Sequence, residues 1–172
     1  MTMEKGLLYN FTGSGKGKTS AALGVVLRAL GHGWKIAVLQ FMKGDRETGE
    51  RLFFQKFFPE IFFEGCGLGR TCRAGDHAGF AREGWKTAAE MLKGFDGELL
   101  VLDELNVALA HGYLNLDDVI SSLQNRRPEL NVIVTGRNSP PELRAVSDLV
   151  SDIAPEKHPY QQGIPARKGL DY

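Results

Sequence analysis

The segment from residue 12 to residue 19 constrains this chain more than any other feature. It reads Thr-Gly-Ser-Gly-Lys-Gly-Lys-Thr, follows the apolar run 7–11 and precedes 20–27, whose small and apolar residues suit a helix. The order of strand, glycine-rich turn and helix is the context of a phosphate-binding loop. The glycines let the backbone approach an oxyanion, and the free amides at a helix start favour negative charge. Because Lys18 adds a cation and the Thr19 hydroxyl suits Mg²⁺, the segment predicts a nucleoside triphosphate site.

One position departs from the usual pattern of this loop, G-x-x-x-x-G-K-[ST]. Thr12 stands where the first glycine is expected. Gly13, Gly15 and Gly17 keep the segment able to close around a phosphate. A glycine-rich turn that binds nothing is the alternative, but the Gly-Lys-Thr end and both flanks favour the phosphate loop.

Length and charge limit the remaining possibilities. The chain has 172 residues, with 21 basic and 21 acidic side chains, so its formal net charge is zero. We expect a single domain over residues 1–172, because this length suits one buried core. The balanced charge gives no overall field that attracts nucleic acid or an anionic membrane. With no signal-peptide pattern and no apolar run of membrane-spanning length, we expect a cytoplasmic protein without nucleic acid or membrane partners.

Apolar runs alternate with segments of helical period along the chain. Strands are expected at 7–11, 35–41, 61–64, 98–104, 132–135 and 149–153. Helices are expected after Thr19 and at 52–58, 78–93, 115–125 (capped by Asn115) and 140–146. Strands that alternate with helices predict an α/β fold with a mostly parallel central sheet and helices on both faces.

The apolar strand expected before residue 104 ends in two carboxylates, Asp103 and Glu104. A carboxylate at such a strand end is the usual partner of a phosphate loop, where it serves the metal. Neighbouring side chains on a strand point to opposite faces, so one acid would hold Thr19 or a metal-bound water and the other would reach a ligand. Two solvated acids are the alternative, and the pairing with Lys18 and Thr19 favours the functional interpretation.

Two arginines are candidates for contacts with phosphate or with another subunit. Arg137 follows the expected strand 132–135, at the edge where open parallel sheets bind ligands. A guanidinium there can contact phosphate oxygens, or it can simply lie at the surface. Arg28 lies further along the helix that follows Thr19, where spacing alone indicates a surface or intersubunit charge.

The cysteines and histidines show no catalytic or metal-binding spacing. Cys66 and Cys72 lie in a glycine- and arginine-rich segment, and His77 is the nearest additional ligand in the sequence. We therefore expect two reduced thiols, with a redox or metal role as the alternative. No spacing of serine or cysteine with histidine predicts a nucleophilic enzyme.

Several of these segments together resemble the P-loop ATP-dependent corrinoid adenosyltransferases, a family that acts on cob(I)alamin or cob(I)yrinic acid a,c-diamide. Thr12, unusual for a general phosphate loop, is ordinary in this family. The matching segments occur in family order and span nearly the whole chain: 12–24, 28–33, 40–44, 49–51, 102–106, 135–137, 157–158 and 168–172.

The resemblance implies a RecA-like P-loop NTPase fold, usually a homodimer, that transfers the 5′-deoxyadenosyl group of ATP to cobalt(I) and releases triphosphate. It implies that Thr19 and Glu104 contact Mg²⁺, that Arg28 and Arg137 belong to the nucleotide site, and that a flavoprotein is a candidate reductant. The catalytic candidates are Lys18, Thr19 and Glu104. The residues implied to hold phosphates are Gly13, Ser14, Gly15, Lys16, Gly17, Lys18, Thr19 and Ser20. Because cobalt(I) is itself the nucleophile, no general base is needed.

The sequence departs from the family pattern at two places. Leu68 and Arg70 stand where aromatic residues of the family help to detach the lower cobalt ligand. The chain also begins about one strand before the phosphate loop, so the basic N-terminal helix that covers the active site of some members is not expected here.

Two other functions remain open at this point. A P-loop phosphotransferase or ATPase would keep Lys18, Thr19 and Asp103, and Glu104 could position its attacking water. A non-enzymatic carrier would bind a nucleotide or a corrinoid and deliver it to another protein.

Overall fold

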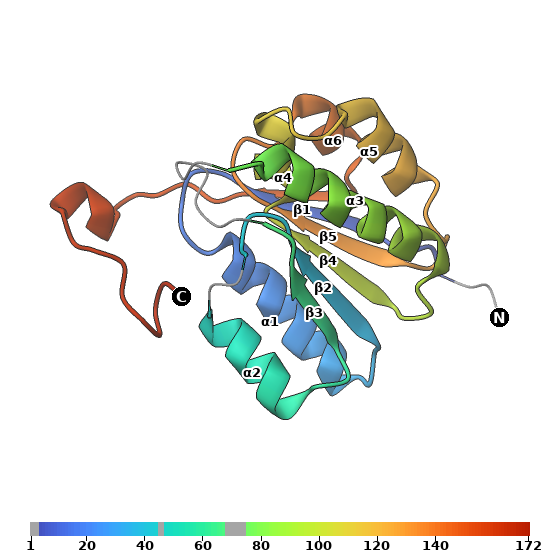
Figure 1. Ribbon diagram of the computed structural model, residues 1–172, viewed down its shortest axis with the longest axis horizontal. Coiled ribbons are helices and arrows are strands. Elements are labelled where there is room, and N and C mark those ends of the chain that lie inside the picture. Colours follow the sequence, from blue (N-terminus) through green and yellow to red (C-terminus); the bar gives the residue numbers. More distant parts are fainter. Residues whose placement is uncertain (1–3, 45–46, 68–74) are drawn as a thin grey trace.

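A computed structural model describes residues 4–44, 47–67 and 75–172 of the chain. These residues form a six-stranded sheet, ordered β3-β2-β4-β5-β1-β6, in which neighbouring strands are parallel (Figure 1). The strands are β1 (Leu8–Thr12), β2 (Ile36–Gln40), β3 (Phe62–Gly65), β4 (Leu99–Asp103), β5 (Asn131–Thr135) and β6 (Leu149–Asp152). The expected parallel α/β sheet is confirmed.

Helices cover both faces of this sheet, as Figure 1 shows. One face carries α1 (Lys18–Gly31) and α2 (Gly49–Phe57). The other carries α3 (His77–Gly94), α4 (Leu105–Ala110), α5 (Leu116–Gln124) and α6 (Pro141–Val146). Each face buries its own hydrophobic cluster. The expected helices on both faces are therefore confirmed.

Strand β4 shows how the sequence produces this layering. All five of its residues are buried. Leu99 and Val101 belong to the cluster beneath α1 and α2, whereas Leu100 and Leu102 belong to the cluster on the opposite face. A strand covered on both sides must be apolar at every position, so the alternation typical of a half-exposed strand is absent from β4. Asp103 then emerges at the carboxyl edge of the sheet.

Glu104 lies outside β4, which corrects the expected strand 98–104. Its φ angle of 61° places it in the left-handed region, and α4 begins at the next residue. The chain thus turns between Asp103 and Glu104, and the argument that they occupy opposite faces of one strand does not apply. Helix α4 has only six residues, which is too short for a helical period to stand out beside the apolar run.

Side-chain caps define several helix starts. Asn115 accepts a hydrogen bond from the Asp118 amide at 3.0 Å, which confirms the expected cap of α5. Thr48 caps α2 and Asp76 caps α3 in the same way. Helix α2 therefore begins at Gly49, earlier than its apolar spacing predicts, because a cap rather than hydrophobicity sets its start. Leu68, Arg70 and Cys72 lie outside the described residues, so the expectations about them stay predictions.

Beyond β6 the chain leaves the sheet at its carboxyl edge. The segment extends away from the helices, includes a short 3-10 helix at Pro159–Gln162, and returns so that residue 172 lies near the start of α1 (Figure 1). Residues 153–172 thus frame the edge of the sheet to which the phosphate loop belongs.

Within the described part of the chain, no helix combines the length and apolar character needed to cross a membrane.

Because the sheet is buried on both faces, truncating a side chain of its central strand β4 should cost much of the protein's stability. Leu100→Ala should lower the free energy of unfolding by about 2–5 kcal/mol, because Leu100 is fully buried and a cavity would remain. Leu27→Ala is the matched control: Leu27 is 69% exposed on α1, so the cost should stay within about 0.5 kcal/mol. Urea unfolding followed by circular dichroism measures both. Equal costs would contradict the assigned core.

Candidate active site

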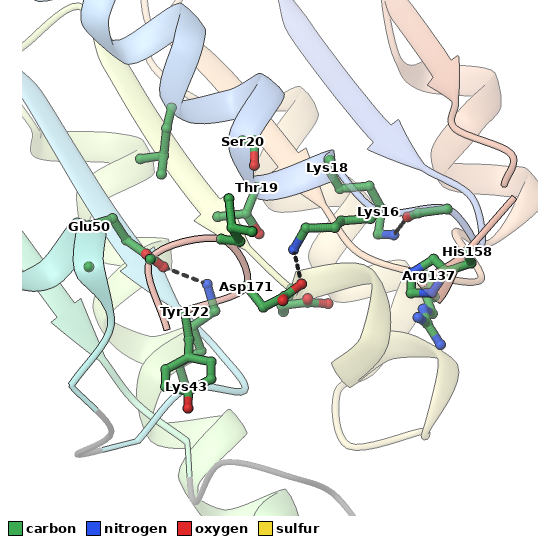
Figure 2. Close-up of a pocket in the computed structure, with 17 residues that line it drawn as sticks. Lys16, Lys18, Thr19, Ser20, Lys43, Glu50, Arg137, His158, Asp171 and Tyr172 are labelled. Atoms are coloured by element: carbon green, nitrogen blue, oxygen red, sulfur yellow. Dashed lines mark hydrogen bonds and ion pairs between the residues drawn. The ribbon is translucent and has the colours of Figure 1, made fainter. Parts of the chain in front are cut away.

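A cavity of about 590 Å³ opens at the carboxyl edge of the sheet, beside the start of α1 (Figure 2). It is lined by the phosphate loop, by the start of α2, by residues that follow β2, β4 and β5, and by residues of the 153–172 segment. Its predicted members are Gly15, Lys16, Gly17, Lys18, Thr19, Ser20, Glu104 and Arg137. The structure therefore brings these predicted residues together around one cavity.

The phosphate loop has the backbone geometry that its glycines predict. Gly17 has φ +120° immediately before α1, a conformation that side chains disfavour. Gly15 packs closely against Ile153, the residue that follows β6. A Cβ added at Gly15 would lie 2.7 Å from the Ile153 carbonyl oxygen. Its amide donates to that same oxygen at 2.7 Å. The loop is thus shaped by backbone contacts that only glycine permits.

Lys18 is buried at the base of the loop. Its ammonium donates to the Gly15 carbonyl oxygen at 2.6 Å. Burial lowers the pKa of Lys18, although the nearby Glu104 carboxylate opposes this effect. An incoming anion would offset the cost of burying this charge, so the ammonium is placed to exchange a backbone carbonyl for a phosphate oxygen.

Asp103 is the polar centre of the site and is only 1% exposed. Its Oδ1 accepts hydrogen bonds from Thr19 Oγ1 at 2.8 Å and from Thr135 Oγ1 at 2.7 Å. Its Oδ2 accepts from Gln40 Nε2 at 3.0 Å and lies 3.2 Å from Lys43 Nζ. The structure thus brings Asp103 to Thr19, as one branch of the sequence argument proposed.

Lys43 and Glu50 are site residues to which the sequence analysis assigned no role. Lys43 Nζ lies 2.8 Å from Glu50 Oε1 (Figure 2). Burial alone would lower the pKa of Lys43, but the carboxylates of Asp103 and Glu50 outweigh it and raise that pKa. Lys43 is therefore a firmly charged cation facing the cavity. In the sequence, only its place in the family segment 40–44 pointed to Lys43. The pairing with Asp103 arises because β2 and β4 are neighbours in the sheet, which local patterns do not show.

Glu104 lines the cavity from the turn between β4 and α4. Its backbone amide donates to Thr135 Oγ1 at 3.0 Å, which fixes the turn against β5. Burial, followed by the neighbouring Asp103 charge, raises the pKa of the Glu104 carboxyl. A bound cation would offset both effects, so the position suits a metal ligand.

A buried amide network supports Arg137 at the end of β5. Asn106 Nδ2 donates to Asn10 Oδ1 at 2.9 Å and to the Gly136 carbonyl oxygen at 3.2 Å. Gly136 has φ +129°, which turns the chain sharply before Arg137. Arg137 is exposed and lines the cavity, so its guanidinium is free to turn toward an anion in the site.

Three predicted site residues do not line this cavity. Gly13 and Ser14 belong to the same loop, but the cavity begins at Gly15. Arg28 is exposed on the last turn of α1, well along the helix from the loop. Its role in a nucleotide site stays a prediction, and the surface or intersubunit charge indicated by its spacing agrees with this exposure.

Residues from the end of the 153–172 segment complete the cavity wall. His158, Gly169, Leu170, Asp171 and Tyr172 line it opposite the phosphate loop. Lys16 Nζ forms an ion pair with Asp171 Oδ1 at 2.7 Å (Figure 2). The chain folds back over many residues to make this contact, so local sequence patterns gave no indication of it.

The described cysteine has the properties of a structural thiol. Cys66 is half-buried, and its Sγ lies 3.6 Å from the Gln40 carbonyl oxygen. Burial raises the pKa of the Cys66 thiol to about 11, so it stays protonated at neutral pH. Among the described residues, no group of three or more His, Cys, Asp or Glu side chains could hold a metal ion.

The parallel sheet, the glycine loop at the start of α1 and the buried Asp103 on Thr19 define a protein of the α/β class with a P-loop fold. The chain belongs to the family of ATP:corrinoid adenosyltransferases BtuR/CobO/CobP, whose model matches residues 4–172. The family expected from the sequence segments is thus confirmed, and its members are transferases.

Curated relatives match along nearly the whole chain. A corrinoid adenosyltransferase of Pseudomonas aeruginosa is 44% identical over 172 residues, covering 98% of this chain and 85% of the relative. A corrinoid adenosyltransferase of Escherichia coli K12 is 39% identical, covering 98% and 87%. Among solved structures, the flagellar accessory protein FlaH from Methanocaldococcus jannaschii has a TM-score of 0.61 at 11% identity, covering 86% of this chain and 71% of that chain. This last likeness concerns the fold alone and supports the expected RecA-like arrangement.

The loop geometry predicts opposite effects for one substitution at two glycines. Gly17→Ala should abolish nucleotide binding and destabilise the protein by about 1 kcal/mol or more, because φ +120° strains any side chain. Gly24→Ala, inside α1 with open space around it, should instead stabilise by up to about 1 kcal/mol. Thermal unfolding and ATP titration calorimetry measure both variants. Full ATP affinity in Gly17→Ala would contradict the loop assignment.

Proposed function

We propose that this chain transfers the 5′-deoxyadenosyl group of ATP to the cobalt(I) of a corrinoid, in the synthesis or salvage of an adenosylated cobalamin. The observation that carries the proposal is the match to the adenosyltransferase family over residues 4–172, which includes every element of the cavity. The cobalt lone pair attacks C5′, the C5′–O bond breaks, and triphosphate leaves with the bonding electrons while cobalt is formally oxidised to cobalt(III).

The cavity suits a triphosphate leaving group. Lys16, Lys18, Lys43 and Arg137 all line it and supply positive charge. The free amides at the start of α1 add a further attraction for anions. Preorganised charges of this kind stabilise a leaving group as negative charge develops on it. In this reaction the protein must align C5′ with cobalt and hold triphosphate, and it does not need to activate a nucleophile of its own.

We further propose that Mg²⁺ accompanies ATP and is held by Thr19 and Glu104. Both supply hard oxygen ligands and both line the cavity. The raised pKa of Glu104 fits this role, because burial and Asp103 leave its carboxylate short of compensating positive charge. Asp103 would orient the Thr19 hydroxyl through their 2.8 Å hydrogen bond. When bound, Mg²⁺ supplies charge neutralisation to the triphosphate.

A homodimer, a cytoplasmic location and a flavoprotein reductant complete the proposal. They rest on the family resemblance. Arg28 is exposed on α1, which leaves this arginine accessible to another subunit. Analytical ultracentrifugation of wild type and Arg28→Ala tests this part, and a wild-type monomer at micromolar concentration would contradict it.

The adenosyl-transfer assay is the direct test of function. The protein is incubated without oxygen with chemically reduced cobalamin, Mg²⁺ and ATP. We expect a light-sensitive cobalt–carbon product and an equal amount of triphosphate, followed by absorbance and ion chromatography. Release of ADP and phosphate without cobalt alkylation would instead indicate an ATPase, with Glu104 as the residue that positions water. Tight binding without turnover, followed by transfer of bound cofactor to an acceptor protein, would indicate a carrier.

Two substitutions test the assigned loop residues. Lys18→Ala and Thr19→Ala should each lower kcat/KM at least about 100-fold, because each removes a contact to triphosphate or its metal. Lys93→Ala removes an exposed lysine from the far end of α3 and should keep the wild-type rate. Circular dichroism checks that all three variants fold. Wild-type rates in both loop variants would refute the site.

A further inference from the structure

The segment 153–172 touches the phosphate loop at both of its ends. At its start, the Ile153 carbonyl oxygen accepts the Gly15 amide at 2.7 Å. At its end, Asp171 pairs with Lys16, the residue that follows Gly15. Figure 1 shows the chain between these contacts swinging out and back toward the start of α1. The segment therefore forms a strap around the loop instead of an unattached tail.

The returning end of this strap is a closed turn. The Leu170 and Asp171 amides donate to the Arg167 carbonyl oxygen at 3.2 and 2.8 Å, and the Gly169 amide donates to the Tyr172 carbonyl oxygen at 2.9 Å. Gly169 has φ +86°, which the reversal requires. These bonds close the turn through its own backbone, and the turn presents Asp171 to the cavity.

Asp171 divides its carboxylate between the turn and the loop. Oδ2 accepts the Arg167 amide at 2.7 Å, and Oδ1 pairs with Lys16 Nζ at 2.7 Å. The Arg167 hydrogen bond, together with Lys16, lowers the pKa of Asp171, so the carboxylate is ionised at neutral pH. Both oxygens are engaged, and its charge is balanced by the ammonium that it holds.

Lys16 gains a fixed position from this pairing. The Lys16 side chain is 47% exposed and extends from a glycine-rich loop, where it would otherwise sample many rotamers. An ammonium has three donor hydrogens, so a bond to Asp171 leaves two for phosphate oxygens. A pre-positioned cation loses less conformational entropy when the anion binds.

We propose that residues 168–172 form one wall of the triphosphate site and that Asp171 is a positioning residue, which holds Lys16 over the phosphate loop to receive triphosphate. The inference deepens the proposed function and rests on its triphosphate site. It assigns a role to the strap that the fold alone does not require, because the sheet and both helical layers are complete before residue 153.

The test uses Asp171→Asn, which is nearly isosteric. Asparagine can still accept the Arg167 amide, so the turn is kept while the ion pair with Lys16 is lost. The affinity for inorganic tripolyphosphate, measured by calorimetry, should fall roughly threefold to tenfold, with a parallel rise in KM for ATP. Asp96→Asn is the matched control, since it breaks the Lys35–Asp96 pair of 2.8 Å on the surface away from the cavity.

A double-mutant cycle with Lys16→Met shows whether Asp171 acts through Lys16. Asp171→Asn should cause no further loss of tripolyphosphate affinity once Lys16 is methionine. Additive losses, wild-type affinity in Asp171→Asn, or tighter binding in that variant would each overturn the inference. Thermal unfolding should be unchanged in Asp171→Asn, which separates positioning from folding.

The binding measurement is independent of the proposed reaction. If tripolyphosphate affinity depends on Asp171 through Lys16 but wild type forms no cobalt–carbon bond, the inference stands and the adenosyl-transfer proposal fails. If adenosyl transfer occurs and Asp171→Asn binds tripolyphosphate as wild type does, the positioning role fails and the proposed function stands.

Discussion

The buried carboxylate of Asp103 is the interaction on which the rest of this site depends. It ends β4 and gathers donors from α1, β5 and the end of β2, through Thr19, Thr135, Gln40 and Lys43. A buried charge is tolerated only when it is paired and hydrogen-bonded, so the four contacts are a condition for its burial. They also lock the phosphate loop to the centre of the sheet. The same atoms thus stabilise the fold and align the site.

Backbone contacts impose a second constraint, because they couple the phosphate loop to the chain that follows the sheet. Gly15 packs against Ile153 and donates its amide to the Ile153 carbonyl oxygen, which ties the loop to the residue that follows β6. Lys16 and Asp171 repeat the coupling at the other end of the strap. Around the cavity, four cationic side chains (Lys16, Lys18, Lys43 and Arg137) lie among Glu50, Glu104 and Asp171, and Asp103 is buried beside Lys43. The empty site thus has as many acidic as basic side chains, so an incoming triphosphate would need a metal cation to offset its charge.

Local patterns were sufficient for the layers of the fold and for the phosphate loop. Continuous apolar runs such as 99–102 identify strands covered on both faces, and Asn115 identifies a helix start. Three features escaped prediction for a common reason. The turn at Glu104, the Lys43 ion pairs and the Asp171 contact are each set by tertiary packing, which no local period records. Arg28 differs from these residues. It belongs to a family segment but does not line the cavity, so its role in the nucleotide site stays a prediction.

The division of labour in the proposed reaction explains why the site is built from charges and not from an acid–base pair. Cobalt(I) brings its own electron pair, so a side chain that removed a proton would have nothing to act on. Rate then depends on holding C5′ in line with cobalt and on stabilising triphosphate as it departs. Lys18 and Lys43 are fixed by Gly15, Glu50 and Asp103 before the substrate arrives. Preorganised cations of this kind act on the leaving group without reorganising during the reaction, which is the task that adenosyl transfer sets.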